Sequence, residues 1–292
     1  MSATWRDRRD LFLLPRTASA LSAAAAARAL RQVAAHTNAY SEEARNALAG
    51  ARAAQWVIDD PQTFSTRFRL QLALGYRDNW RLMRNPQCAA PFSAQALDAL
   101  NATRAPLLII SLHWASAIFA LREIARRFGP THFVSAPFTR EEFSTFPLRF
   151  AFANRMAGMI EKACNAPQIY TGGGGAEAIA SALQAGRNVC ALIDVPPHQV
   201  GATSTHVIQG RTFQLPNGLA RIAYETGANV VTLLSAPDAA GGDHFVSINS
   251  LGQMLHPNAL MPHCAALLEE ALTREPAAWT MWAHLPDFLS QS

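Results

Sequence analysis

Residues 105–122 read APLLIISLHWASAIFALR, an apolar run that reaches a histidine and then passes into a helical pattern. The run from Leu107 to Leu112 is apolar except for Ser111, which is typical of a short strand buried on both faces. After His113, apolar residues recur at helical spacing as far as Ile124. The stretch therefore predicts a strand that turns into a helix at His113, with this side chain at the carboxyl end of the strand.

A histidine in that place is a candidate for acid–base chemistry. In open α/β sheets ligands bind at the carboxyl edge, and an imidazole there can act as a general base near neutral pH. The alternative is that His113 is a hydrogen-bonded core residue beside Trp114.

The composition indicates a large core and a weakly basic, apolar surface. Of the 292 residues, 50% are hydrophobic and 16% are charged, against a usual charged share of about 25%. The net charge is +4, a balance that suits a membrane surface or an acidic ligand better than a nucleic-acid groove. We therefore expect no nucleic-acid partner.

Cysteine usage and hydropathy indicate a cytoplasmic protein. The 4 cysteines are far apart and form no CxxC pair, so we expect reduced thiols and no zinc site. No segment reaches the roughly 18 to 20 apolar residues of a membrane-spanning helix, and no signal peptide is recognisable.

The order of patterns predicts an α/β fold with a central, mainly parallel sheet flanked by helices, behind a helical N-terminal section. We place the helical section at residues 1–100 and the α/β domain at residues 101–292. Further strands are expected at 132–136, 168–171, 187–195, 229–234 and 245–248. Residues 137–154 have helical spacing, whereas 199–211 form a largely polar stretch that we interpret as a loop.

Within the helical section, a hairpin is expected between residues 17 and 58, with a new helix beginning at Ser41. The basic and apolar residues of 4–16 either lie in the plane of an anionic bilayer or pack on the domain. An amphipathic helix over 63–84 carries an aromatic and apolar stripe that is usually core.

The strand pattern at 187–195 ends on a second candidate residue, Asp194. Its carboxylate either faces His113 across the edge of the sheet or caps the local turn. The glycines at 172–175 precede a helix, but they match no phosphate-loop pattern and indicate a flexible connection.

Several of these pieces together resemble the bacterial lysophospholipid-acyltransferase superfamily, in its lipid A late-acyltransferase branch. The element around His113 is similar to the family's H-x4-D/E motif, and AGRNVCALID at 185–194 to its strand ending in an acid. Residues 210–234 and PAAWTMWAH at 276–284 resemble two later family segments. The resemblance covers roughly residues 100–285.

The resemblance implies acyl transfer in which His113 takes a proton from a hydroxyl that attacks a thioester of acyl carrier protein or coenzyme A. It implies no metal and no bound cofactor. Five residues after the histidine, where the family has an acid, this chain has Ile118. Ser116, one turn on, or Asp194, from the neighbouring strand, would then have to orient the imidazole.

Further residues come from the same comparison. Arg155 lies near the place of a family arginine suited to the thioester oxyanion, or it is a solvated helix residue. Arg211 and Arg221 fall within a matching segment and either contact phosphate or are surface and capping residues. Phe146 and Phe150 either line an apolar tunnel for the acyl chain or fill the core.

Two functions remain open. The first is an acyltransferase, peripheral at the inner face of the cytoplasmic membrane, that acts on a lipid, glycolipid or carrier-tethered hydroxyl. The second is an impaired family member that binds an acyl chain, lipid or carrier protein as an accessory subunit, which Ile118 favours. A carboxylate oxygen within about 3.2 Å of a His113 ring nitrogen would restore the catalytic pair.

Overall fold

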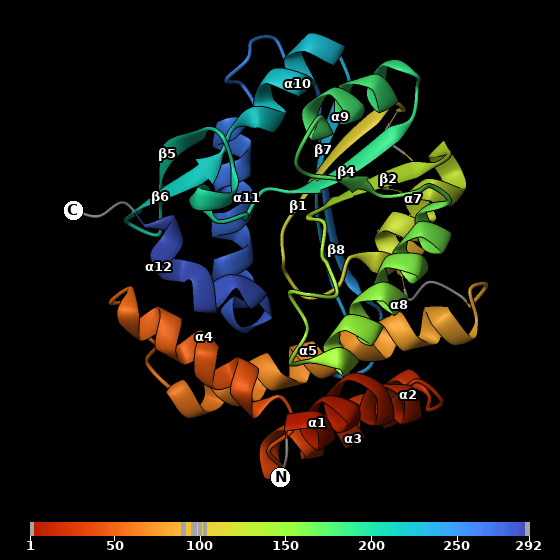
Figure 1. The fold of residues 1–292 in the computed structure, drawn as a ribbon, viewed down its shortest axis with the longest axis vertical. Coiled ribbons are helices and arrows are strands. Elements are labelled where there is room, and N and C mark those ends of the chain that lie inside the picture. The colour runs from red at the N-terminus through yellow and green to blue at the C-terminus, as the bar shows by residue number, and fades with distance from the viewer. Residues whose placement is uncertain (1–2, 89–91, 95–97, 99–100, 102–103, 290–292) are drawn as a thin grey trace.

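The centre of the molecule is a six-stranded sheet flanked by helices, as the computed structural model in Figure 1 shows. The structure describes residues 3–88, 92–94, 98, 101 and 104–289. The strand order is β3-β2-β4-β1-β7-β8. These strands are β1 (Leu107–Ser111), β2 (Thr131–Ser135), β3 (Ile169–Tyr170), β4 (Asn188–Leu192), β7 (Asn229–Ala236) and β8 (Phe245–Gln253). The predicted α/β class, with a mainly parallel sheet and a helical N-terminal section, is confirmed.

Strand β1 lies in the interior of the sheet, parallel to β4 on one side and to β7 on the other. Successive side chains of a strand point to opposite faces, and all five residues of β1 are buried. Leu108 and Ile110 enter one apolar cluster, whereas Leu107 and Ile109 enter another. The continuous apolar run is therefore explained by burial on both faces.

The register between β1 and β4 brings two loops together. Ser111 pairs with Leu192, and the strands run in the same direction. His113 follows Ser111 by two residues and Asp194 follows Leu192 by two residues. Because paired parallel strands are roughly 5 Å apart, these two side chains leave the sheet at neighbouring points of its carboxyl edge.

Helices connect the parallel strands and follow the last one. They are α7 (Ile118–Phe128), α8 (Pro147–Cys164), α9 (Gly175–Gln184), α10 (Gly218–Thr226), α11 (Met261–Arg274) and α12 (Leu285–Phe288). Short 3-10 helices are η2 (Pro197–Gln199), η3 (Pro276–Ala278) and η4 (Thr280–His284). Among the described residues, no helix combines the length and the apolar character that crossing a membrane requires.

The N-terminal section is helical and lies across one end of the α/β part (Figure 1). Its elements are α1 (Ala3–Asp7), a π-helix η1 (Arg8–Leu13), α2 (Leu14–Ala18), α3 (Ala23–His36), α4 (Ser41–Ala53) and α5 (Pro61–Arg84). The predicted helix start at Ser41 is confirmed, whereas the predicted hairpin is wrong: α3 and α4 each pack against α5 rather than against each other. Helix α5 begins after Asp60, whose carboxylate accepts the backbone N–H groups of Gln62 and Thr63.

Much of the stretch at 4–16 packs on the molecule. The ring of Phe12 meets those of Trp80 and Phe152 at centroid distances of 6.1 and 5.8 Å. Leu11 is buried, whereas Trp5 and Leu13 remain exposed. The packed interpretation therefore accounts for the inner face of this segment, while its outer face carries both apolar and basic side chains.

The transition after β1 differs from its prediction. No helix begins at His113: a loop over 112–117 intervenes, and α7 starts only at Ile118. Trp114 forms an isolated β-bridge with Trp279 instead of a helical turn. A contact with a segment far along the chain thus overrides the local helical spacing.

Two other segments also differ. The helix expected over 137–154 begins at Pro147, because proline suits a first helical position and disfavours helical backbone in the residue before it. The expected loop over 199–211 contains β5 (Thr203–Ile208), which pairs with β6 (Arg211–Pro216) in an antiparallel hairpin. Gln209 and Gly210 turn the hairpin with φ of 48° and 73°, the left-handed pair that tight hairpins require.

The packing of α4 on η4 predicts a strong effect of Gly50→Ala. A Cβ at Gly50 would lie 2.1 Å from the carbonyl oxygen of Trp282 and 2.8 Å from Cα of Ala283. Because both neighbours are backbone atoms, we expect the free energy of unfolding to fall by at least about 1–3 kcal/mol in urea denaturation.

The matched control is Gly158→Ala, within helix α8. A Cβ there meets nothing within 4 Å, so the better helix propensity of alanine should raise stability by about 0.5–1 kcal/mol. Equal effects of the two substitutions would contradict the close approach of α4 to η4.

Candidate functional site

The loop that carries His113 is held by the C-terminal segment. The carbonyl oxygen of His113 accepts the backbone N–H of Thr280 at 2.8 Å and its hydroxyl at 3.1 Å. The N–H of Ala115 donates to the carbonyl oxygen of Ala278 at 2.8 Å. Ala115 has a φ of 47°, a conformation rare outside glycine that persists only when surrounding contacts impose it. Residues 278–280 supply those contacts.

His113 and Asp194 form a direct pair. Nδ1 of His113 lies 3.0 Å from Oδ1 of Asp194, inside the distance that we set for a catalytic pair. The Asp194 side chain is fully buried, whereas the His113 side chain is 38% exposed. The imidazole of His113 is therefore accessible to solvent or ligand, whereas the carboxylate that contacts it is not.

The Asp194 carboxylate is surrounded by hydrogen-bond donors. Nε1–H of Trp279 donates to Oδ2 at 2.7 Å, and the backbone N–H of His113 donates to the same carboxylate at 2.9 Å. A buried carboxylate is stable only with such partners. Because an ionised carboxylate only accepts hydrogen bonds, Nδ1 of His113 carries the proton and Nε2 of the neutral ring has a free lone pair.

Two opposing effects set the pKa of His113. Burial lowers it, whereas the charge of Asp194 and its hydrogen bonds raise it. The charge and hydrogen bonds of Asp194 together outweigh the effect of burial, so the pKa of His113 lies above the ordinary 6.5. The neutral imidazole, which can accept a proton, is therefore populated as the pH rises through that elevated value.

The position five residues after His113 has no part in this pair. Ile118 is buried in the apolar cluster that also contains Leu107 and Ile109. Ser116 has no hydrogen bond to His113 in the described part of the chain and lies instead on the wall of a cavity. Of the two candidate orienting residues, Asp194 is the one in contact with the imidazole.

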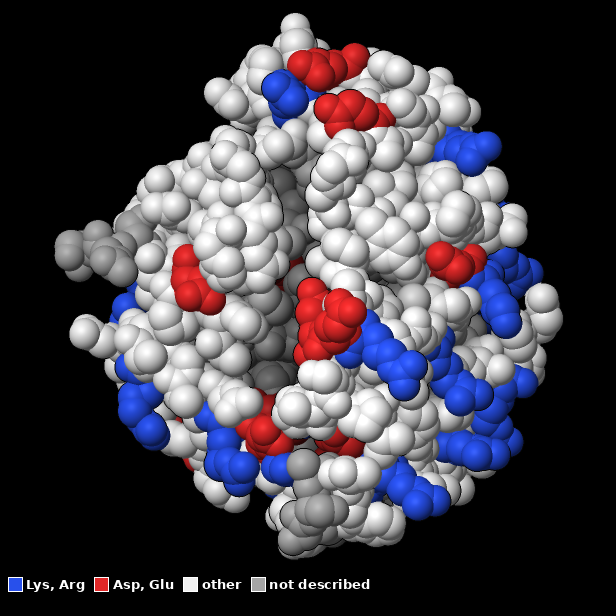
Figure 2. All heavy atoms as spheres, in the orientation of Figure 1, with Lys and Arg blue, Asp and Glu red and all other residues white. Residues whose placement is uncertain are grey.

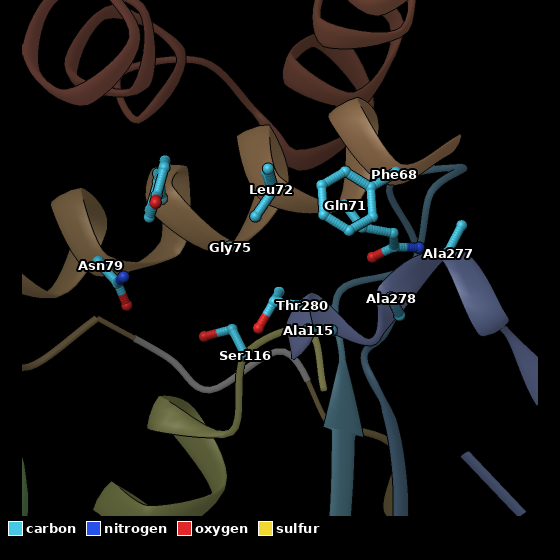
Figure 3. A pocket seen from close by; sticks show the side chains of 11 residues that line it. Phe68, Gln71, Leu72, Gly75, Asn79, Ala115, Ser116, Ala277, Ala278 and Thr280 are labelled. Carbon is cyan, nitrogen blue, oxygen red and sulfur yellow. The ribbon is translucent and has the colours of Figure 1, made fainter. Parts of the chain in front are cut away.

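That cavity lies between α5 and the loop after His113 and has a volume of about 230 Å³. Figure 3 shows side chains of α5 on one side and Ala115, Ser116 and Thr280 on the other. Its wall begins two residues after His113. The N-terminal helical section therefore forms one wall of a cavity whose opposite wall includes the loop after His113, although His113 itself is not a lining residue.

Helix α5 contributes polar groups that we did not predict. Gln71 is only 8% exposed, and its Oε1 has no hydrogen-bond partner among the described residues. In Figure 3 the Gln71 and Asn79 side chains extend from α5 at the cavity wall. Gln71, Gly75 and Asn79 recur at steps of four and therefore share one face of α5, a spacing that is visible in the sequence beside the apolar stripe.

Trp279 was also missed as a site residue. Its indole is fully buried and holds a carboxylate 85 positions away. The only signal in the sequence is the WTMW segment, which does not reveal its partner.

The three predicted arginines lie elsewhere. Arg155 stacks on Trp80 at 5.1 Å and lines a second cavity. Arg211 donates to the carbonyl oxygens of Ala54 and Gln55, as the capping alternative expects. Arg221 is an exposed residue that pairs with Glu225 one helical turn on, as the surface alternative expects.

The two predicted phenylalanines differ from each other. Phe146 is exposed and lies beneath the guanidinium of Arg149. Phe150 packs against Phe138 and Phe143 at centroid distances of 6.1 and 6.0 Å. Neither residue lines the cavity beside Ser116.

The face of the molecule drawn in Figure 2 has a hollow along its middle, and acidic side chains lie beside this hollow. Among the described residues, no group of three or more His, Cys, Asp or Glu could hold a metal ion. The 4 cysteines are free thiols.

Comparison with known proteins adds no identification. No protein-family model matches the chain, and no curated protein matches it. The functional interpretation rests on the pair of His113 and Asp194, on the adjoining cavity and on the resemblance described above.

Replacing Asp194 by Asn should lower the pKa of His113. The substitution removes the charge that raises this pKa and leaves burial, which lowers it, so the pKa should fall below its wild-type value. The measurement is an NMR titration of the imidazole, with the His113 signal assigned from a His113→Gln variant.

Asp287→Asn is the matched control, because Asp287 lies 3.4 Å from the exposed His284. It should leave the His113 titration unchanged. An unaltered His113 pKa in Asp194→Asn would mean that the buried carboxylate does not act on the imidazole.

Proposed function

We propose that the protein transfers an acyl chain from a thioester of acyl carrier protein or coenzyme A to a hydroxyl group. The observation that carries this proposal is the 3.0 Å contact between Nδ1 of the half-exposed His113 and the buried carboxylate of Asp194. This is the arrangement of a general base with its orienting acid. A general base is used in many reactions, and the resemblance to acyltransferases is our reason for proposing acyl transfer.

In this reaction Nε2 of His113 takes the proton of the acceptor hydroxyl. The oxygen attacks the thioester carbonyl carbon, the carbon–sulfur bond breaks, and the imidazolium returns its proton to the departing thiolate. Asp194 stabilises the imidazolium between these steps, and Trp279 keeps the carboxylate in place. No metal or bound cofactor takes part in the proposed sequence.

The cavity beneath α5 is proposed to hold the hydroxyl-bearing end of the acceptor. It is lined by hydroxyl groups of Ser116 and Thr280 and by the amide of Gln71, whose oxygen has no partner among the described residues. A second hydroxyl or an N–H group of the acceptor, separate from the reacting hydroxyl, would supply the missing donor. At about 230 Å³ the cavity suits one polar end of a larger molecule.

A lipid or glycolipid acceptor would bring the protein to the inner face of the cytoplasmic membrane. The large apolar residues Trp5, Leu13 and Leu21 of the N-terminal section are 45%, 41% and 45% exposed. Arg8 and Arg16 are exposed on the same short segment. Apolar side chains flanked by cations favour a peripheral position on anionic lipid.

The accessory function is the second candidate. Its support is Ile118 in place of the family's acid. The contact of Asp194 with His113 weakens that support, because the imidazole has a carboxylate partner from another strand.

His113→Ala should abolish transfer. Loss of a positioned base costs about 10² to 10⁴ in rate, so thioester consumption by the purified protein should fall by that factor. The assay offers acyl carrier protein and coenzyme A thioesters with membrane-extract acceptors. The wild-type rate should rise with pH through a pKa above 6.5, because His113 must be neutral to accept a proton.

His263→Ala, which removes an exposed histidine of α11, should retain the wild-type rate. If His113→Ala transferred acyl groups as fast as the wild type, the proposal would fail. If the wild type and His113→Ala both bound the carrier protein and neither transferred acyl groups, the accessory function would be favoured.

Gly75→Leu should test the cavity separately. A Cβ at Gly75 lies 3.6 Å from Cβ of Ser116, so Gly75→Ala is tolerated, whereas a leucine side chain would fill the space. We expect Gly75→Leu to raise the KM for the acceptor about tenfold or more, with the His113 pKa unchanged, and Gly75→Ala to behave as the wild type. Equal KM values in the two variants would place the acceptor elsewhere.

A further inference from the structure

A second cavity lies between α5, α7 and α8 and has a volume of about 770 Å³. It shares no lining residue with the cavity beside Ser116. Its size is within the range of about 300–1,000 Å³ that is usual for small-molecule sites. The proposed acyl transfer makes no use of it.

Four cations from two facing helices line this cavity. Arg122 and Arg126 are one turn apart on α7, and Arg155 and Lys162 are two turns apart on α8. These spacings place each pair on a single face of its helix. Among the described residues that line the cavity there is no aspartate or glutamate.

The positive charge is only partly neutralised. Oε1 of Glu123 lies 3.2 Å from Nη2 of Arg122 and 3.4 Å from Nη1 of Arg126, so two guanidinium groups share one carboxylate. In the described part of the chain, neither Arg155 nor Lys162 forms an ion pair with an acidic residue. Both are exposed, whereas Arg122 is 4% exposed.

Arg122 also has an unfulfilled donor. Its Nη1 donates to the carbonyl oxygen of Pro86 at 3.0 Å, but its Nε is buried with no partner among the described residues. A buried N–H without an acceptor is costly, so the hydrogen-bonding capacity of Arg122 is not fully met by its described neighbours. Arginine's planar fork suits phosphate in particular.

We propose that this cavity is a binding site for an organic phosphate, a phosphate monoester that carries an apolar group. Arg122, Arg126, Arg155 and Lys162 surround its phosphate. Leu82 and Met159 on the wall contact its apolar part. The site does not depend on the acyl transfer proposed above, since its described lining includes neither His113 nor Asp194 and no residue of the cavity beside Ser116.

The surface around the cavity is also basic, which favours an anionic ligand. Figure 2 shows Lys and Arg side chains gathered on the right-hand side of this face, over the part of the molecule that carries α8 and the end of α5 in Figure 1. Such a concentration of one sign of charge raises the local concentration of anions.

Lys162 provides a direct probe, because it is the only lysine in the sequence. Acetic anhydride would modify its amine, and mass spectrometry of the peptide that contains residue 162 would measure the rate. We expect phenyl phosphate to protect Lys162 in a saturable manner. Benzyl alcohol, which has a similar ring and no phosphate, should give no protection.

Arg126→Gln is the test variant, since Arg126 is exposed and its loss leaves Arg122 to pair with Glu123. Removing one charged contact should weaken phenyl phosphate binding about tenfold. Arg127→Gln, the next residue of α7 and outside the cavity, is the matched control and should bind as the wild type.

Two outcomes would support the site, and they distinguish the two possible origins of the bound phosphate. Protection by phenyl phosphate in solution would indicate a small phosphorylated molecule. Protection only by vesicles of equal parts phosphatidylcholine and phosphatidic acid, and not by phosphatidylcholine alone, would indicate a lipid phosphate. Absence of protection by either probe, or an equal affinity in Arg126→Gln and Arg127→Gln, would overturn the proposal whether or not acyl transfer is found.

Discussion

The burial of one carboxylate governs the arrangement of the candidate site. Asp194 has no exposed surface, so its charge must be met by donors that the protein itself supplies. The indole of Trp279 and both the backbone and the ring of His113 supply them. Because these groups come from the C-terminal segment and from the loop after β1, the need to satisfy Asp194 holds three distant parts of the chain together.

The same constraint links the helical section to the chemistry. The C-terminal segment that carries Trp279 also packs against α4, where Gly50 admits the backbone of Trp282, and against α5 through Phe64 and Trp282. Helix α5 then forms the far wall of the cavity beside Ser116. The N-terminal helices therefore contribute one wall of the proposed acceptor cavity. Helix α5 also borders the basic cavity lined by Arg155 and Lys162.

Local patterns predicted the elements well where burial and periodicity agree. The apolar run of β1 and the stripe of α5 reflect the faces that these elements bury. The patterns failed at two segments, one decided by a distant contact and one by pairing with the next segment of the chain. Trp114 has helical spacing but bridges to Trp279, and the polar residues of 203–208 form a strand because they pair with β6. Trp279 is far along the chain from Trp114, so no local pattern reveals that contact. Strand β6 follows β5 after only two residues, but the weak alternation of the polar residues in β5 concealed the strand.

The sequence by itself determined the α/β class, the burial of β1 and the position of His113 and Asp194 just beyond two strand ends. Each follows from periodicity and from the rule that parallel strands end at one edge. Only the tertiary structure decided that Asp194, rather than Ser116, holds the imidazole, since that depends on the pairing of Ser111 with Leu192. It also decided that Trp279 completes the pair and that Arg155 joins Arg122 in a separate cavity. The physical reason is that strand order and helix packing bring together residues that are far apart in the sequence and show no recognisable spacing.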